Sequence, residues 1–212
     1  MSARSAAGVK ICGINDAEGF DAAVTAGADW IGFNFFPASP RYVMPATAAA
    51  LSAGRTGGPA RVALFVEPTD AEVAAVTAAF RPDVLQVYAD VARVAALRAR
   101  FGLPVWRAVG VTGPEDLPDT AAGADALLIE SKAPPGATRP GGRAARFDWG
   151  VLSGWAPGFG WLLAGGLTPA NVAEAIRVTG APAVDVASGV ERIPGRKDPA
   201  LIAAFVAAAK AA

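Results

Sequence analysis

"VKICGINDAEGFDAAVTAGADWIGFNF", residues 9–35, decides the fold, because it reads as a strand, a helix and a second strand. The two flanking runs, "VKIC" (9–12) and "WIGFNF" (30–35), are short and almost continuously apolar, which is typical of parallel strands buried on both faces. The segment between them, residues 15–27, predicts a helix. Two parallel strands joined by a helix of this length form a right-handed βαβ unit.

The same alternation of apolar runs and alanine-rich segments continues along the chain. Six further strands are predicted: "RVALFV" (61–66), "VLQVY" (84–88), "VWRAV" (105–109), "ALLIE" (126–130), "WLLAG" (161–165) and "AVDVA" (183–187). Further helices are predicted over 68–80, 168–180 and 198–212, with weaker signals at 45–53, 90–100, 114–122 and 148–155.

Caps mark the ends of several of these helices. Asn15 is a possible N-cap of the first helix, which ends at Gly27, while Gly180 ends the segment 168–180 and Asp198 caps the last helix. Eight strands, each followed by a helical segment, predict an α/β protein in which a single (β/α)8 TIM barrel spans residues 1–212. An open doubly wound sheet is the structural alternative.

Composition narrows the cellular setting and the partners. No apolar run approaches 18 residues and the start "MSARSAAGVK" has no signal-peptide core, so we expect neither a membrane partner nor export. The chain has one cysteine and therefore no internal disulfide, which agrees with a cytoplasmic location. Lys plus Arg equal Asp plus Glu at 19 each, so net charge gives no reason to expect a nucleic-acid partner.

The residues that the chain lacks limit its chemistry. Without histidine there is no Ser-His-Asp triad and no histidine-bound zinc, and with one cysteine there is no CxxC redox pair. Acid–base chemistry must therefore use Cys12, carboxylates, lysine or tyrosine.

Catalytic residues of a barrel lie at the carboxyl ends of its strands and in the loops that follow. That rule selects the following polar positions: Cys12, Arg41, Gln86, Tyr88, Arg107, Glu130 and Asp185. Cys12 is either a small buried hydrophobe or a proton carrier, and a nearby cation such as Lys10 would lower its pKa. Glu130 is either bonded to neighbouring groups or available as an acid, and Asp185 has the same two interpretations.

Two glycine-containing loops follow the seventh and eighth predicted strands. "AGGLTP" (164–169) precedes a helix, and "ASG" (187–189) ends the last strand. Glycines allow backbone N–H groups to approach an anion, and the loops after strands seven and eight often form a phosphate site in barrels. The alternative is that these glycines form tight turns. The Gly- and Pro-rich segment 131–146 is either a mobile surface loop or a lid over the site.

In this order, the motifs of the chain resemble the phosphoribosylanthranilate isomerases of tryptophan biosynthesis. The motifs are "KICGI" (10–14), "GADWIGFNFFPASPRYV" (27–43), "FDW" (147–149), "AGGLTPANV" (164–172), "DVASGVE" (185–191) and "PGRKD" (194–198). The resemblance covers nearly the whole chain. It implies an enzyme that performs the Amadori rearrangement of N-(5′-phosphoribosyl)anthranilate, a phosphorylated small molecule, with neither cofactor nor metal.

The resemblance also implies roles for individual residues. Cys12 matches the family's general base, which removes the C2′ proton, and Glu130 stands where the family has an aspartate as general acid. Arg41 matches an arginine near the anthranilate carboxylate, and Asp185 matches an aspartate of strand eight. The phosphate loops match Gly165, Gly166, Ser188 and Gly189.

The fourth strand and its loop depart from the family pattern. Where the family usually reads "LQLHG", this chain reads "LQVYA" (85–89), so that Tyr88 replaces a histidine while Gln86, an expected substrate ligand, is kept. Two other functions stay open: an isomerase of a related phosphorylated amino sugar, and a non-catalytic barrel that binds a phosphometabolite. We expect the protein to be a monomer or a homodimer.

Overall fold

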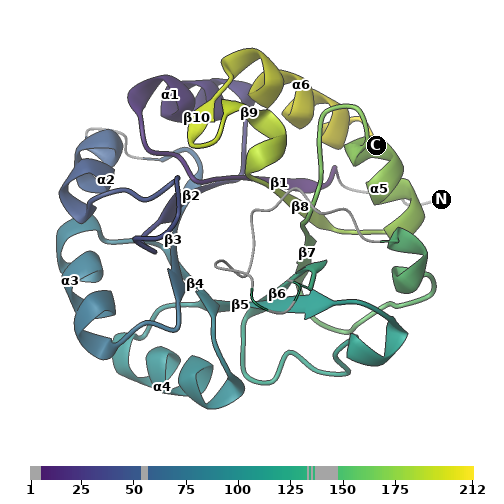
Figure 1. Ribbon diagram of the computed structural model, residues 1–212, viewed down its shortest axis with the longest axis horizontal. Helices are drawn as coiled ribbons and strands as arrows, with labels where there is room; N and C mark the ends of the chain where they lie inside the picture. The colour runs from purple at the N-terminus through teal and green to yellow at the C-terminus, as the bar shows by residue number, and fades with distance from the viewer. Residues whose placement is uncertain (1–5, 54–56, 133, 135, 137–147) are drawn as a thin grey trace.

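The computed structural model describes residues 6–53, 57–132, 134, 136 and 148–212. Eight parallel strands pair in sequence order and close into a barrel, because the last strand pairs with the first (Figure 1). This closure confirms the TIM barrel and excludes the open sheet. The strands are β1 Gly8–Cys12, β2 Trp30–Asn34, β3 Ala60–Val66, β4 Val84–Tyr88, β5 Val105–Val111, β6 Ala126–Ser131, β7 Trp161–Leu163 and β8 Ala183–Val186.

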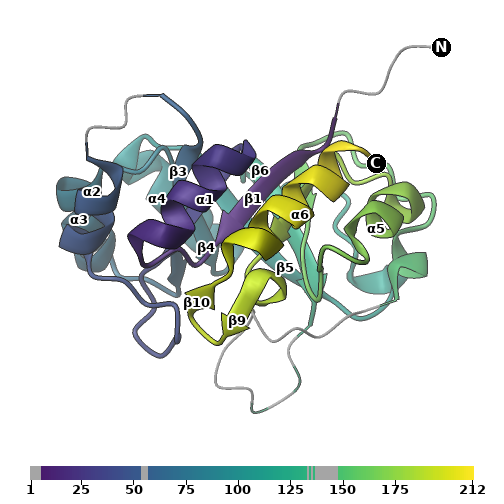
Figure 2. The same cartoon turned by 90° about the horizontal axis from the view of Figure 1, so that it is seen from above.

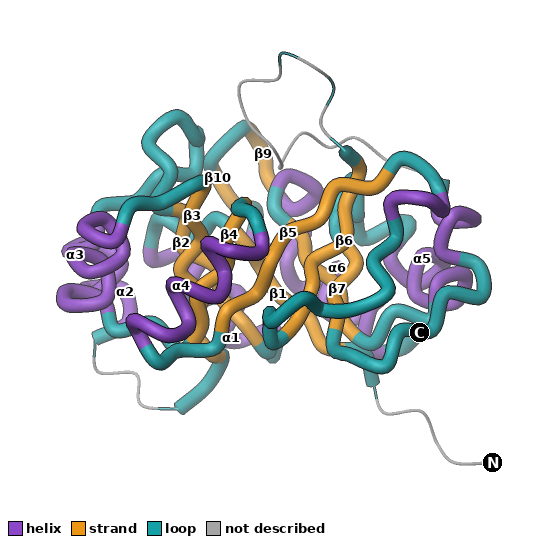
Figure 3. Tube along the Cα trace, turned by 90° about the horizontal axis from the view of Figure 1, so that it is seen from below, coloured by secondary structure: helices purple, strands orange, loops and turns teal. Residues whose placement is uncertain are grey.

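Helices surround the strands on the outside of the barrel (Figures 1 and 3). They are α1 Ala17–Ala26, α2 Pro45–Ser52, α3 Asp70–Phe80, α4 Val91–Phe101, α5 Val172–Thr179 and α6 Pro199–Lys210. The main apolar core lies between these helices and the strands, and it includes Phe20, Phe33 and Phe205. Within the described ranges, no helix combines the length and the apolarity that crossing a membrane requires.

The expected helices after β5 and β6 are wrong. Short 3₁₀ turns stand in their place, η1 at Pro114–Asp116 and η2 at Trp149–Leu152. Pro114 begins the turn, where proline is tolerated, but Pro118 would remove a backbone donor from a helix that continued through 114–122. Gly154, whose φ is +75°, follows η2 in a conformation that does not continue a helix.

Most predicted caps are confirmed, and one is displaced. Gly27 and Gly180 end their helices in the left-handed conformation, and Asp198 caps α6. The N-cap of α1 is Asp16 rather than Asn15, since the Asp16 carboxylate accepts a 2.8 Å hydrogen bond from the N–H of Gly19. The backbone N–H groups of Gly13 and Ile14 still donate to Gly32 of β2, so the chain turns into the helix one residue later than predicted.

The barrel interior is apolar at the amino ends of the strands and polar further along. A cluster of inward side chains fills the first part: Val62, Val84, Trp106, Ala126, Leu162 and Ala183, with Trp30 packed against it. Because side chains alternate along a strand, the next inward positions of β1, β4 and β8 are Lys10, Gln86 and Asp185. Arg107 follows the inward Trp106, so it lies on the outer face of β5, and its selection as a site residue is wrong.

A small antiparallel hairpin follows β8 and was not predicted. It consists of β9 Glu191–Ile193 and β10 Arg196–Lys197, which follow the 3₁₀ turn η3 Ser188–Val190. β9 and β10 lie together at one end of the barrel, beside the loop that follows β2 (Figures 2 and 3). Contact with that loop is close, because a Cβ on Gly195 would lie 2.3 Å from the carbonyl oxygen of Pro40. The hairpin therefore joins two of the loops on which functional residues were predicted.

Candidate active site

The two candidate proton carriers are both buried at the carboxyl ends of their strands. Cys12 ends β1 and is 4% exposed, while Glu130 is the penultimate residue of β6 and is 6% exposed. Alternation from the inward Ala126 places the side chain of Glu130 inside the barrel. Asp185 of β8, which is 8% exposed, influences the pKa values of both groups. The structure therefore brings these three predicted residues together.

Lys10 links the thiol to Asp185. Its Nζ donates a 2.7 Å hydrogen bond to Asp185 Oδ1, and its side chain is fully buried. A Cβ on Gly32 would lie 2.9 Å from both Lys10 Nζ and Cys12 Sγ, so the absence of a side chain at Gly32 leaves room for this group. Burial lowers the pKa of Lys10, but Asp185 and Cys12 raise it by more, and the net shift is upward. Lys10 is therefore a cation beside the thiol.

The thiol nevertheless has a raised pKa. Burial is the largest cause and the charge of Asp185 adds to it, while Lys10 and Lys197 act in the opposite direction. The cation expected from the sequence is present, but it does not lower the pKa of Cys12 below the ordinary value, because burial outweighs it. In the ligand-free protein Cys12 is thus a neutral thiol at neutral pH, and its thiolate is a strong base.

A substantial fraction of Glu130 is protonated at neutral pH. Burial raises the pKa of its carboxyl to about 7; the Tyr88 hydroxyl lowers it, Asp185 raises it and Lys10 lowers it. Barrel geometry accounts for the contact with Tyr88. Trp30, Val84, Ala126 and Ala183 come from alternate strands of the inward cluster, and four residues further on these strands carry Asn34, Tyr88, Glu130 and Ala187. A carboxyl with a pKa near 7 suits a general acid.

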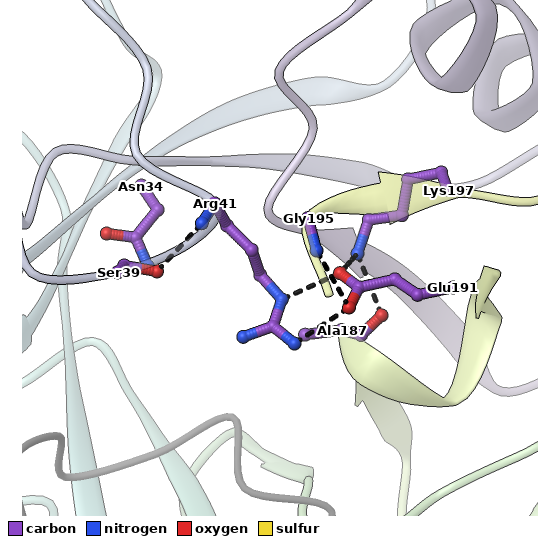
Figure 4. A network of polar contacts seen from close by, with 7 residues as sticks. All are labelled: Asn34, Ser39, Arg41, Ala187, Glu191, Gly195 and Lys197. Carbon is purple, nitrogen blue, oxygen red and sulfur yellow. Dashed lines mark hydrogen bonds and ion pairs between the residues drawn. The ribbon is translucent and has the colours of Figure 1, made fainter. Parts of the chain in front are cut away.

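Arg41 lies at the mouth of the barrel beside Cys12. A Cβ on Gly13, the residue after Cys12, would lie 2.5 Å from Cδ of Arg41. Nε and one terminal nitrogen of Arg41 donate to the two carboxylate oxygens of Glu191 at 2.7 and 2.8 Å (Figure 4). Asn34 and Ser39 hold the loop from the other side, since Asn34 donates to Ser39 Oγ, which also accepts from the N–H of Arg41.

Lys197 completes this second group. Its Nζ donates to Glu191 Oε1 at 2.9 Å and to the carbonyl oxygen of Ala187 at 2.7 Å (Figure 4). Burial raises the pKa of Glu191, but Arg41 and Lys197 lower it by more, so the carboxylate is charged. Burial lowers the pKa of Lys197, and Glu191 counteracts this.

The loops after β7 and β8 meet each other. A Cβ on Gly189 would lie 1.8 Å from the carbonyl oxygen of Leu167, so only glycine fits where the two loops touch. Gly165 and Gly166 have φ values of +86° and +67°, and Asn171 Nδ2 donates to the carbonyl of Gly166 at 3.0 Å. Gly165 and Gly166 thus turn the chain tightly, Gly189 allows the two loops to touch, and Ser188, at the start of η3, shares the same corner of the barrel.

Comparison with known proteins decides the family. The model of the family described as N-(5′-phosphoribosyl)anthranilate (PRA) isomerase matches residues 9–208. The chain belongs to this family. The PRA isomerase of Acidiphilium cryptum is 55% identical over 204 residues, which cover 96% of this chain and 98% of the relative.

Solved structures of PRA isomerases have the same fold. One, a complex with reduced 1-(o-carboxyphenylamino)-1-deoxyribulose 5-phosphate, is 31% identical with a TM-score of 0.82, covering 97% of this chain and 100% of that one. A second, described as mutually generated monomers of the dimeric isomerase of Thermotoga maritima, is 32% identical with a TM-score of 0.81 and the same coverage.

Two residues of this PRA isomerase family member were missed by sequence reasoning. Glu191 and Lys197 lie within the quoted motifs "DVASGVE" and "PGRKD", but no role was assigned to them. Their signal was the charge of both residues within a glycine- and proline-rich segment that follows the last strand. The partners of these two residues depend on contacts with the loop after β2, and no local sequence pattern predicts those contacts.

Three further predictions concern Gln86, the segment 131–146 and a metal site. Gln86 is 1% exposed, and its Oε1 accepts no hydrogen bond from the part of the chain that the structure describes. The suggested lid at 131–146 lies largely outside the described residues, which include only 131, 132, 134 and 136 of it. Within the described ranges, no group of three His, Cys, Asp or Glu side chains could hold a metal ion.

Proposed function

We infer that this protein is an enzyme of tryptophan biosynthesis that converts N-(5′-phosphoribosyl)anthranilate into 1-(2-carboxyphenylamino)-1-deoxyribulose 5-phosphate. The observation that carries this conclusion is the match of residues 9–208 to the PRA isomerase family. The burial of Cys12 and Glu130 inside one barrel supports it, because the reaction needs one acid and one base on the same sugar.

Glu130 acts first in the proposed mechanism. Its carboxyl gives a proton to the ring oxygen of the ribose while the bond between that oxygen and C1′ breaks. The nitrogen lone pair of the substrate forms a C1′=N double bond, which leaves a protonated imine. The pKa of about 7 means that a substantial fraction of Glu130 holds the required proton at neutral pH.

Cys12, in the fraction of molecules that carry it as a thiolate, then removes the proton from C2′. The electrons of the C2′–H bond form a C1′=C2′ double bond, and those of the C1′=N bond return to nitrogen and give an enolamine. Transfer of the C2′ hydroxyl proton to C1′ yields the ketone, so the sequence is a rearrangement without net oxidation. Loss of the proton from Cys12 to solvent and uptake of one by Glu130 restore both groups. Lys10 stabilises the thiolate while it exists, because its charged Nζ is held beside Sγ.

Substrate binding is divided among the remaining residues. Arg41 meets the anthranilate carboxylate, since a guanidinium offers paired N–H donors to a planar carboxylate. The backbone of Gly165, Gly166, Ser188 and Gly189 receives the phosphate, at the corner where the loops after β7 and β8 meet. Gln86 and Asp185 face the sugar, and the free acceptor oxygen of Gln86 suits a ribose hydroxyl.

Location and assembly are also part of the proposal. A cytoplasmic location agrees with the single cysteine and with a biosynthetic reaction on a phosphorylated metabolite. The Thermotoga maritima relative is described as dimeric, so a homodimer and a monomer are both compatible with this fold. Sedimentation of the purified protein distinguishes them.

Loss of substrate fluorescence tests the function. Freshly prepared N-(5′-phosphoribosyl)anthranilate is mixed with the purified protein, and turnover is expected with the wild type. Cys12→Ala is expected to reduce kcat by at least about 10²-fold, since removing an acid or base costs on the order of 10² to 10⁴. Its far-ultraviolet circular dichroism should match that of the wild type.

The other outcomes identify the rival functions. Binding of the substrate without turnover would favour a non-catalytic phosphometabolite-binding barrel. Neither binding nor turnover would favour a related phosphorylated amino sugar as the substrate. Normal activity of Cys12→Ala would remove the thiol from the mechanism.

A further inference from the structure

Glu191, at the start of the β9–β10 hairpin, holds two buried cations at once. Its two oxygens accept hydrogen bonds from Arg41 at 2.7 and 2.8 Å, and Oε1 also accepts from Lys197 Nζ at 2.9 Å. The backbone N–H of Gly195 donates to Oε2 at 3.3 Å. The side chains of Arg41, Glu191 and Lys197 are 6%, 4% and 1% exposed. The carboxylate is thus the shared centre of the group shown in Figure 4.

The charges of this group do not cancel. Arg41 and Lys197 contribute two positive charges and Glu191 one negative charge, so the three side chains together carry one net positive charge. A charge withdrawn from water is unfavourable unless an opposite charge lies close to it. An anionic group of a ligand would therefore be attracted to this end of the barrel.

The group also lies between two parts of the proposed binding site. The side chain of Arg41 crosses Gly13 beside Cys12. On the other side, Lys197 donates to the carbonyl of Ala187, the residue before the loop Ser188–Gly189. Glu191 therefore connects, through one hydrogen-bonded cation on each side, the proposed carboxylate ligand with the proposed phosphate loop.

We propose that Glu191 is a positioning residue for recognition of the substrate carboxylate, because it fixes the plane of the Arg41 guanidinium and, through Lys197, the start of the loop at Ser188. The inference rests on the proposed function, in which Arg41 meets the anthranilate carboxylate. Glu191 touches no substrate. A guanidinium held by two parallel hydrogen bonds cannot rotate out of its plane, so it selects a planar carboxylate by direction as well as by charge.

Equilibrium binding of two ligands tests this role. The first is reduced 1-(o-carboxyphenylamino)-1-deoxyribulose 5-phosphate, and the second is the same compound without the ring carboxylate. The dissociation constant of the second ligand divided by that of the first measures recognition of the carboxylate alone. Glu191→Gln keeps the shape of the side chain and removes its charge. We expect this ratio to fall at least about tenfold in the variant, because a charged partner no longer orients the Arg41 guanidinium toward the ligand carboxylate.

A control on the same hairpin separates positioning from general damage. Arg192 of β9 pairs with Glu18 of α1 at 2.9 Å, and both side chains are about half exposed. Glu18→Gln removes that ion pair and should leave the ratio unchanged, because exposed pairs contribute little. A general loosening of the hairpin would weaken both ligands together and would not change the ratio.

An unchanged ratio in folded Glu191→Gln would overturn the proposal. If that variant does not fold, Glu191→Asp keeps the charge but withdraws the carboxylate by about 1.5 Å, the length of one carbon–carbon bond. The ratio should then fall as well, and a wild-type ratio in Glu191→Asp would overturn the proposal. Turnover by the wild type is measured separately, so absence of the proposed function and absence of this positioning role give different results.

Discussion

Two buried charge groups lie near the carboxyl ends of the strands, and they come from different parts of the fold. The barrel group pairs Lys10 with Asp185 at 2.7 Å, and both residues belong to strands, β1 and β8. The hairpin group centres on Glu191, and its cations Arg41 and Lys197 come from a loop and from β10. Strands fix the first group, whereas contacts between loop segments create the second.

The pKa values of the acidic groups are shifted in opposite directions in these two places. At Cys12 and Glu130, inside the barrel, burial prevails and raises both pKa values, so at neutral pH Cys12 is a thiol and a substantial fraction of Glu130 is protonated. In the hairpin, two cations outweigh burial, so the pKa of Glu191 is lowered and its charge is permanent near neutral pH. This difference agrees with the proposal that residues of the barrel carry out acid–base chemistry and that the hairpin group helps to bind an anion.

The largest expected difference concerns stability. Lys10→Met removes the cation that pairs with buried Asp185, and breaking a buried pair costs about 3–5 kcal/mol in the free energy of unfolding. Lys197→Met should cost clearly less, because Arg41 still neutralises Glu191. Urea denaturation measures both values. Equal losses would show that the two groups do not differ in this way.

The double variant Lys10→Met/Asp185→Asn sharpens that result. It removes both charges of the barrel pair, so it should lose less stability than the two single variants together. Additive losses would mean that Asp185 is neutralised by something other than Lys10.

Stability as a function of pH should have opposite signs at Glu130 and Glu191. The pKa of Glu130 rises on folding from 4.5 to about 7, so its contribution is present below pH 4.5 and is lost as pH rises to 7. At 1.36 kcal/mol per pH unit, Glu130→Gln should therefore gain about 3 kcal/mol relative to the wild type between pH 4.5 and 8.

Glu191→Gln provides the opposite case. The pKa of Glu191 falls on folding, so its contribution is present above pH 4.5 and is lost as pH decreases through the lowered value. The variant should therefore be less stable than the wild type at pH 7, and the difference should shrink in acid. Thermal denaturation across this range measures both variants, and a common sign would contradict the comparison.

Activity provides a second measurement on Glu130. Glu130→Gln cannot donate the proton to the ring oxygen and should lose far more of kcat than Glu130→Asp, which keeps an acid. If the wild type and both variants have equal kcat values, Glu130 takes no part in the mechanism.

The smallest expected effect is a shift in a pH profile. In the proposed mechanism the reactive form has Glu130 protonated and Cys12 as thiolate, and the pKa of Glu130 is the lower of the two. The value of kcat/KM should therefore increase with pH up to about 7, stay constant, and decrease above the raised pKa of Cys12. Tyr88→Phe removes a hydroxyl that lowers the pKa of Glu130, so the lower limb should move to higher pH.

Tyr42→Phe is the matched control for that shift. The Tyr42 hydroxyl donates to the sulfur of Met44 at the surface, so its removal should leave the limb in place. An unchanged limb in Tyr88→Phe would mean that its hydroxyl does not act on Glu130.

Strand residues of the site were predictable because their positions follow from two regular patterns. The period of two along a strand and the closed order of eight strands place Lys10, Cys12, Glu130 and Asp185 inside the barrel. Arg107 was selected from the sequence of one strand alone. Whether its side chain points into the barrel depends on the register with the neighbouring strands, which that sequence does not contain. Loop residues follow no such period, so the sequence did not show that Glu191 would meet Arg41 and Lys197.

The amino-acid sequence by itself predicted eight strands and favoured a closed barrel, and it identified the residues that could move a proton, because these follow from apolar runs, caps and composition. Closure of the sheet, with β8 paired to β1, was decided by the tertiary structure. The tertiary structure alone decided the protonation of Cys12, because burial raises the thiol pKa by more than Lys10 lowers it. It also decided the ion pair between Arg41 and Glu191, which is 150 residues away in the sequence. Desolvation and long-range pairing both depend on what surrounds a side chain in space, which no local stretch of sequence contains.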